Sequence, residues 1–130
     1  MQEVYEFLKK CGTYYLATMD GDSPRVRPFG TVAIFEGRLY IQTGKSKPVS
    51  RQIQQNPRVE LCAFDGDTWL RLSGELVRDD RLEAKKYMLD CYPSLKAIYK
   101  AEDDNTEVLY FTRATAVFAS FTAAPKTVTF

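Results

Sequence analysis

Four positively charged side chains lie close together in the sequence, beside a turn rich in hydroxyl groups. Arg25 and Arg27 are two residues apart on a predicted strand, so their side chains should lie on the same face. Lys45 and Lys47 flank Ser46, directly before a predicted helix. Cations, hydroxyl groups and a helix N-terminus are the groups that bind a phosphate monoester. The pattern therefore predicts a site for a small phosphorylated ligand.

Other residues near these cations could contribute to the same site. Thr43 would add a neutral donor, and Arg51, one turn into the predicted helix, would add a further cation. Pro28 removes a backbone donor in mid-strand, which fits a sheet edge or a bulge, and bulges are frequent beside binding sites. The alternative interpretation is that the cations are solvated surface residues, the usual position of lysine and arginine.

The composition excludes several classes of protein. The 130 residues carry a net charge of +1, with both signs spread along the chain. No nucleic-acid partner and no membrane surface is therefore expected, because such surfaces need a concentrated basic field. A chain of this length is expected to form a single domain, residues 1–130.

The cysteines and the missing histidine bear on metal sites and location. The chain has no histidine, and Cys11, Cys62 and Cys91 form no Cys-x-x-Cys pair, so no metal site is expected. We expect reduced cysteines in the core, which is typical of a cytoplasmic protein. The chain also has no signal-peptide pattern and no apolar run of about 18 residues.

No pair of residues resembles a catalytic nucleophile and its base, so the catalytic residues are unknown. Chemistry would have to come from a bound cofactor, acting on a small-molecule substrate. Trp69 lies on the polar face of a predicted strand, beside Arg71. Its indole could stack on a flat ring or lie in a dimer contact, and packing in the core is the alternative.

The periodicity of apolar residues predicts strands joined mostly by tight turns, with helices between some of them. Helices are predicted over residues 2–11, 48–55 and 80–92, with a short helical piece around residues 95–99. Strands are predicted over residues 14–19, 25–35, 38–43, 59–64, 69–76, 108–112 and 115–121. Asp79 and Asp80 should cap the third helix, and the tail after Ala123 should be loose. Tight turns imply antiparallel pairing, which predicts a mainly β (α+β) barrel or sandwich with covering helices.

Five segments, in this order, resemble the pyridoxamine 5′-phosphate oxidase-like flavoproteins, whose fold is the FMN-binding antiparallel split β-barrel. They are Arg-Val-Arg-Pro-Phe (25–29), Glu-Gly-Arg-Leu-Tyr-Ile-Gln-Thr (36–43), Ser-Lys (46–47), Asn-Pro-Arg-Val-Glu-Leu (56–61) and Trp-Leu-Arg-Leu-Ser-Gly-Glu-Leu-Val (69–77). Within this superfamily the chain resembles the short FMN-binding branch that includes nitroimidazole-resistance-type reductases. The similarity extends from the first helix to the final strand.

The resemblance implies an FMN-binding homodimer with two flavin sites in the subunit interface. By analogy, the phosphate would be held by Arg27, with Arg25, and by the turn of Lys45, Ser46 and Lys47. Arg51 is a further candidate.

The same resemblance implies which residues would lie along the rest of the flavin. Gln42 and Thr43 would lie along the ribityl chain or the ring edge. Pro28 and Phe29 would present backbone near the ring, and the partner subunit's Trp69 would approach it.

The chain departs from those oxidases at two places. One of their basic residues falls near Val49 here, so Lys47 or Arg51 would have to substitute for it. Their C-terminal Arg and His segment has no counterpart, so oxidation of pyridoxamine phosphate is not expected. The expected function is an FMN-dependent oxidoreductase that passes electrons from NAD(P)H or another reductant to an unknown small-molecule acceptor. The alternatives are a non-catalytic flavin- or haem-binding module, and a barrel that binds single-stranded nucleic acid. A deazaflavin in place of FMN is also open.

Overall fold

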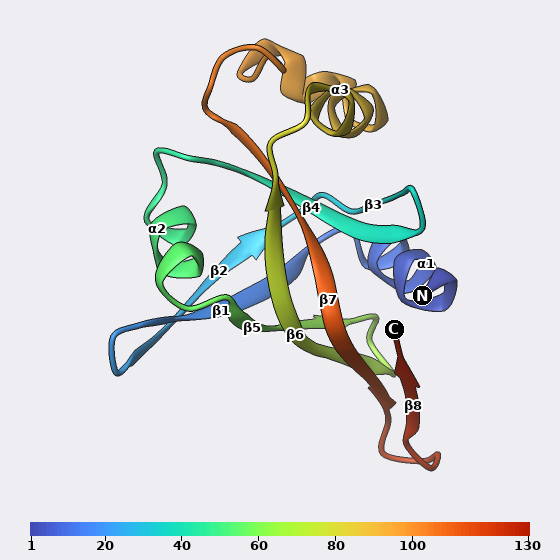
Figure 1. Ribbon diagram of the computed structural model, residues 1–130. Coiled ribbons are helices and arrows are strands. Elements are labelled where there is room, and N and C mark those ends of the chain that lie inside the picture. The colour runs from blue at the N-terminus through green and yellow to red at the C-terminus, as the bar shows by residue number, and fades with distance from the viewer.

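The computed structural model describes residues 1–130 and shows a strongly curved antiparallel sheet with helices around it (Figure 1). The strands are β1 (Tyr14–Asp20), β2 (Ser23–Phe29), β3 (Ala33–Phe35), β4 (Arg38–Gly44), β5 (Arg58–Phe64), β6 (Trp69–Asp79), β7 (Thr106–Ala119) and β8 (Lys126–Thr129). The helices are α1 (Gln2–Cys11), α2 (Pro48–Gln55), α3 (Leu82–Cys91) and the short 3-10 helix η1 (Pro93–Ala97). The strand order is β2-β1-β5-β6-β7-β4-β3, with β8 paired to β7. This confirms the predicted mainly β (α+β) fold, an antiparallel split β-barrel with covering helices.

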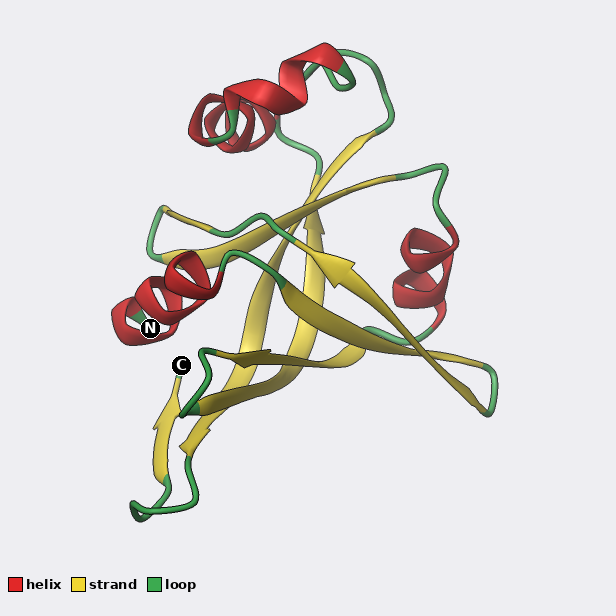
Figure 2. Ribbon diagram, turned by 180° about the vertical axis from the view of Figure 1, so that it is seen from behind, coloured by secondary structure: helices red, strands yellow, loops and turns green.

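The hydrophobic core fills the inside of the curved sheet. Burial alternates along β5, whose inward Leu61 is 1% exposed, as expected for a strand with one face in a core. Val4 and Leu8, one turn apart on α1, pack into the same core. The helices lie at separate places around the sheet and do not form one layer (Figure 2). No helix is both long and apolar enough to span a membrane.

The single strand predicted over residues 25–35 is wrong, because the chain forms two strands there. β2 pairs with β1, whereas β3 pairs with β4 at the far end of the strand order. Between them the backbone leaves the sheet, and tyrosine hydroxyls bind its polar groups. Tyr14 Oη donates to the Thr31 carbonyl at 2.6 Å. Tyr92 Oη accepts from Val32 N–H at 3.0 Å and donates to its carbonyl at 3.1 Å.

The two strands predicted over residues 108–112 and 115–121 are in fact the single long strand β7. Arg113 has a φ of 52°, and the pairing of β7 with β6 shifts by one residue beside Gly74. A Cβ at Gly74 would lie 3.0 Å from the Thr112 carbonyl oxygen, so a larger residue there would press on the backbone of β7 at the bulge. The strand therefore bends without ending.

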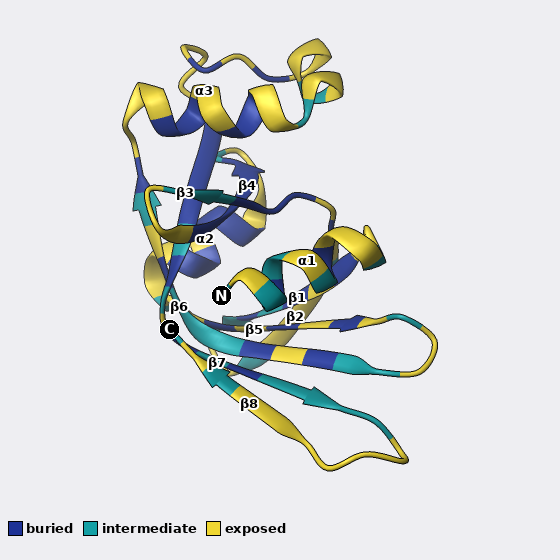
Figure 3. Cartoon of the chain, turned by 90° about the vertical axis from the view of Figure 1, so that its right-hand side faces the viewer, coloured by how far each residue is buried: buried dark blue, intermediate teal, exposed yellow.

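The sequence predicted a loose tail after Ala123. This prediction is wrong, because the tail contains β8. The backbones of Phe130 and Ala114 exchange two hydrogen bonds, of 3.0 and 2.8 Å. β8 and the turn before it are mostly exposed or half-buried (Figure 3). Backbone pairing with β7, the ion pair of Lys126 with Glu3 at 2.6 Å and the packing of Val128 and Phe130 on the core order this segment. All of these contacts are with distant residues, so local side-chain patterns did not predict them.

The cysteines are not core residues, contrary to expectation. Cys62 and Cys91 are exposed, Cys11 is half-buried, and all three are free thiols. Cys62 takes an outward position on β5, between the inward Leu61 and Ala63.

Asp79 links β4, β6 and the start of α3 by hydrogen bonds. The sequence predicted that it caps α3, and this prediction is wrong. The N-cap of α3 is Arg81, without a capping side chain. The Asp79 carboxylate accepts from Tyr40 Oη of β4 at 2.7 Å and from Arg81 Nη2 at 2.9 Å. These bonds, the one from Arg81 first, outweigh burial and lower the pKa of Asp79 to about 2.

Replacement of Asp79 by asparagine should change the acid stability of the protein. Because the folded pKa lies below the unfolded value of about 4, the contribution of Asp79 is present above about pH 4 and is lost as the pH falls toward 2. Asp79→Asn should lower the free energy of unfolding by about 1 to 2 kcal/mol at pH 7 and flatten this dependence. Urea unfolding between pH 2 and 7 measures both effects. Asp67→Asn, at an exposed hairpin, is the control, and an acid slope unchanged by Asp79→Asn would contradict the assignment.

Candidate anion-binding cleft

A cleft of about 500 Å³ opens where β2 and β3 separate. The end of β2, the end of β4, the start of α2 and residues 92–99 form its walls. Two cationic side chains, Arg27 and Lys47, line the cleft, and no acidic side chain does. By contrast, a cleft of about 460 Å³ lined mainly by residues of β1, β5 and β6 combines two arginines with two glutamates. The cleft at the split is therefore the one suited to an anion.

Arg27 is half-buried and held in place by neutral acceptors. Its Nη1 donates to Thr18 Oγ1 at 2.7 Å and to the Leu16 carbonyl at 3.2 Å, and its Nη2 donates to Gln52 Oε1 at 2.6 Å. Burial lowers its pKa from the ordinary value, and no carboxylate lies within ion-pair distance. An arginine still keeps its proton under these conditions. Arg27 therefore presents an uncompensated positive charge to the cleft.

Lys47 joins Arg27 at the N-terminus of α2. It is the N-cap residue of this helix, exposed, with Pro48 at the first helical position. It forms no ion pair with any carboxylate of the chain. The N-terminus of a helix carries a partial positive charge, so Lys47 and α2 favour an anion at the same point.

Polar residues at the end of β4 line the middle of the cleft. Gln42 and Thr43 are buried, 6% and 3% exposed, although both face the cleft. Gln42 N–H donates to Thr31 Oγ1 at 3.0 Å, and Gln42 Nε2 donates to the Thr43 carbonyl at 3.0 Å. The structure thus gathers six of the predicted site residues in one cleft: Arg27, Pro28, Phe29, Gln42, Thr43 and Lys47.

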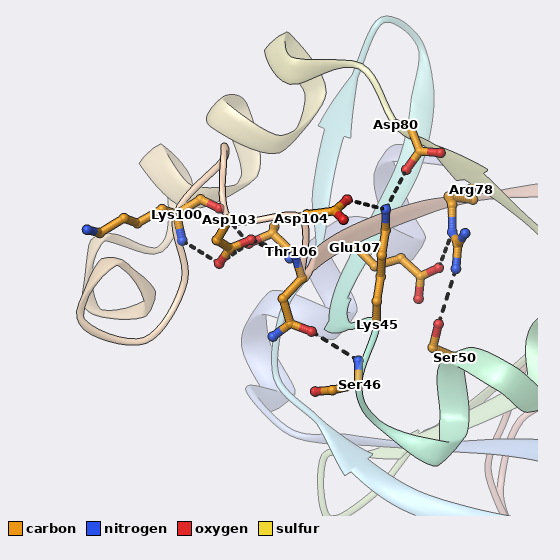
Figure 4. Close-up of polar contacts among 11 residues, drawn as sticks. Lys45, Ser46, Ser50, Arg78, Asp80, Lys100, Asp103, Asp104, Thr106 and Glu107 are labelled. Atoms are coloured by element: carbon orange, nitrogen blue, oxygen red, sulfur yellow. Dashed lines mark hydrogen bonds and ion pairs between the residues drawn. The ribbon is translucent and has the colours of Figure 1, made fainter.

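Four predicted phosphate-site residues lie outside the cleft. Arg25 is exposed nearer the β1–β2 turn, and its Nε lies 3.4 Å from Asp20. Arg51 is exposed on the side of α2 that faces solvent. Lys45 Nζ lies between two carboxylates, at 3.2 Å from Asp80 and 3.4 Å from Asp104, and so is already neutralised (Figure 4).

Ser46, the fourth, serves to position the turn. Its N–H donates to Asn105 Oδ1 at 3.0 Å, and Lys45 N–H donates to the Asn105 carbonyl at 2.7 Å. Arg78 adds a second link, because it binds both Glu107 of β7 and Ser50 of α2 (Figure 4). These contacts hold the start of α2, and with it Lys47, against β7 and the loop before it.

Trp69 does not line the cleft of its own chain. It stands at the start of β6, half-exposed, with its ring 5.2 Å from that of Phe121 in an edge contact. Phe121 is 94% exposed and Phe64, opposite Trp69 on β5, is 58% exposed. The three rings form an aromatic group at one end of the barrel.

Sequence reasoning missed one wall of the cleft and the anchor of Arg27. Tyr92, Leu95, Ile98 and Tyr99 form the wall, and Ile98 is 75% exposed there. Their helical spacing indicates packing, and nothing in it points to a cleft. Gln52, on the inner face of α2, could have been assigned to that face from the spacing of the helix, but its partner could not.

Comparisons with known proteins agree with this architecture. The family model described as pyridoxamine 5′-phosphate oxidase matches residues 1–117. A NimC/NimA family protein from Clostridium acetobutylicum is 44% identical, with a TM-score of 0.97 over 100% of this chain and 92% of that one. General Stress Protein 26 from Bacillus anthracis shares the fold at 16% identity, with a TM-score of 0.79 over 99% and 97% of the chains. A heme binding protein from Mycobacterium smegmatis also shares the fold, at 16% identity, with a TM-score of 0.73 over 96% of this chain and 57% of that one. A search of curated proteins finds no match.

Loss of the Asn105 side chain should loosen the turn that carries Lys47. Asn105→Ala removes one hydrogen bond to backbone, so we expect a loss of about 1 kcal/mol in stability and faster amide hydrogen exchange in residues 44–47. Hydrogen-exchange mass spectrometry measures the local effect. Asn56→Ala is the matched control, because Asn56 accepts from the Arg58 N–H at the other end of α2. Equal exchange of residues 44–47 in both variants would contradict this role.

Proposed function

This chain belongs to the pyridoxamine 5′-phosphate oxidase family, and we propose that it binds FMN in the cleft at the split. We further propose that it is an FMN-dependent oxidoreductase that passes electrons from NAD(P)H or another reductant to a small-molecule acceptor. The observation that carries the proposal is the pair of cations, Arg27 and Lys47, that line the cleft without any carboxylate.

The phosphate end of FMN fits the charged end of the cleft. A phosphate dianion that leaves water needs charge-assisted hydrogen bonds, each of about 1.5 to 3 kcal/mol. Arg27 still has its Nε without a partner among the residues of the chain, and Lys47 is exposed. Two such cations with a helix N-terminus could hold a phosphate at roughly micromolar strength.

The remainder of the cleft suits a flat, largely apolar body. Its volume of about 500 Å³ is within the range of ligand pockets. Phe29, Leu95 and Ile98 line it without adding charge. Exposure of a large apolar residue such as Ile98 beside a cationic end supports an amphipathic ligand.

The chain supplies binding and orientation, and FMN, when bound, supplies the redox chemistry. Arg27 and Lys47 hold the phosphate, and Gln42 and Thr43 offer polar groups along the middle of the ligand. The wall that contains Leu95 and Ile98 would cover one side of the bound ligand. The three free cysteines, without a disulfide, support a cytoplasmic location as part of this proposal.

A homodimer with the flavin at its interface is also part of the proposal. Tyr15, Val26 and Phe64 are 53%, 67% and 58% exposed on the outer face of β1, β2 and β5. The same face carries Arg71 and Glu60, both exposed and without ion pairs in the chain. A mixed face of this kind can pair with its own copy about a two-fold axis. Because Tyr15 lies opposite Pro28 of the cleft, a copy on this face would border the flavin, and its Trp69 could approach the ring.

Removal of both cleft cations should abolish tight FMN binding. Arg27→Ala with Lys47→Ala should weaken FMN at least about 100-fold, since each tenfold step corresponds to about 1.4 kcal/mol and two charge-assisted contacts are lost. Flavin fluorescence during titration of stripped protein measures the affinity. Arg25→Ala with Lys45→Ala removes the same charge outside the cleft. The affinity of this variant for FMN should stay within about threefold of the wild type. Equal losses in the two double variants would refute the site.

Protein loaded with FMN can also distinguish an oxidoreductase from a non-catalytic binding module. Anaerobic NAD(P)H should bleach the absorbance of the bound flavin if the protein transfers electrons. Bound flavin that no reductant bleaches, without turnover of an acceptor, would favour a non-catalytic flavin- or haem-binding module. The likeness to a heme binding protein is one of fold alone, and the chain has no histidine to serve as the usual haem ligand.

A charge on the outer face should disrupt the dimer. Phe64→Asp would replace a large apolar contact of this face with a carboxylate that loses its water on association, so we expect at least tenfold weaker self-association. Size-exclusion chromatography with light scattering measures the mass. Leu82→Asp is the control, because Leu82 is 42% exposed on α3, away from that face. A wild-type monomer in the presence of FMN would contradict this part of the proposal.

A further inference from the structure

The partners of Arg27 differ from those of the other fixed arginines. Arg78 binds Glu107, and Arg81 binds Asp79 and Glu36, so their charges are compensated within the fold. Arg27 donates instead to the Leu16 carbonyl, Thr18 Oγ1 and Gln52 Oε1, none of which is charged. We call these three acceptors the neutral clamp.

The neutral clamp is buried and comes from two elements. Thr18 on β1 and Gln52 on α2 are 2% and 3% exposed. Thr18 Oγ1 donates to Gln52 Oε1 at 2.6 Å and accepts from Arg27 Nη1 at 2.7 Å. The oxygen of Gln52 thus receives two hydrogen bonds, which fixes its amide and the guanidinium together. Packing of α2 on β1 therefore sets the direction of Arg27.

We propose that Thr18 and Gln52 are positioning residues that hold Arg27 at the cleft without compensating its charge. The neutral clamp thereby makes the site selective for a ligand with a phosphate monoester over the same ligand without it. This inference rests on the proposed function, because it names the group that the cleft recognises.

Comparison of the amide of Gln52 with a carboxylate or an apolar side chain at the same position supports this role. A carboxylate at the position of Gln52 would form a buried ion pair with Arg27 and would halve the excess charge of the cleft, from two cations to one. Such a pair can hold the side chain equally well, but it competes with an incoming anion for the guanidinium. An apolar residue would leave Arg27 free to turn away. Only a neutral acceptor gives both a fixed position and a full charge.

The test compares two variants of the same helix that add the same charge. Gln52→Glu places a carboxylate against Arg27, whereas Gln54→Glu places one on the exposed side of α2. Titrations use FMN, riboflavin, which lacks the phosphate, and inorganic phosphate, read by flavin fluorescence or by the shift in melting temperature. A melting temperature of Gln52→Glu equal to that of the wild type, or above it, would show that the fold is intact.

We expect Gln52→Glu to weaken FMN and inorganic phosphate by at least about tenfold, the effect of one charge-assisted contact. Riboflavin should change by less than about twofold in the same variant, and Gln54→Glu should match the wild type for all three ligands. A merely structural role of Gln52 would weaken FMN and riboflavin alike. Thr18→Val provides a second measurement should Gln52→Glu fail to fold. It should lower the ratio of FMN to riboflavin affinity by a smaller factor, about threefold.

The outcomes separate this inference from the proposed function. If wild-type protein binds FMN but Gln52→Glu keeps the same preference for FMN over riboflavin, the neutral clamp is refuted and the flavin site stands. If inorganic phosphate binds in a Gln52-dependent manner while FMN does not bind, the clamp stands and the flavin proposal falls. If wild-type protein binds neither, both are overturned.

Discussion

The architecture depends on one constraint, which is that the buried peptide groups between β2 and β3 must form hydrogen bonds. At Thr31 and Val32 the chain leaves the sheet in a buried place, where unpaired peptide groups would be costly. The hydroxyls of Tyr14 and Tyr92 bind these groups, one from inside the core and one from the start of η1. The chain can therefore pass from one end of the strand order to the other, and the cleft opens at the point of divergence.

The cationic side chains fall into two groups, according to whether a carboxylate of the chain lies beside them. Lys45 meets Asp80 and Asp104, and Arg78 meets Glu107, so these cations tie loops and helices to the sheet. Arg27 and Lys47 meet no carboxylate and face the cleft. Residues of one type thus have opposite roles, because an ion pair within the fold removes the field that an external anion would feel.

The start of α2 is where these two groups of contacts meet. Asn105 and the Arg78–Ser50 contact hold this end of the helix from one side, and Thr18 holds Gln52 from the other. Lys47 and Arg27 are consequently fixed relative to each other although 20 residues separate them in the sequence. The position of the candidate anion site depends on how α2 packs on β1 and on the contacts of its start with Asn105 and Arg78.

Local patterns determined much of this protein. Alternation and helical spacing predicted α1, α2, β5 and the antiparallel class, because each of these elements has one face in the core. Residue types also predicted a phosphate site near residues 25–47, since cations beside a helix start are visible in any sequence. The break in residues 25–35, the continuity of β7 and the pairing of β8 were not predictable in this way, because they depend on hydroxyls, a bulge and backbone bonds from distant segments. Only the tertiary structure separated Arg27 and Lys47 from Arg25, Lys45 and Arg51, since the chain's own carboxylates and the direction of each side chain decide whether a cation is free to bind an anion.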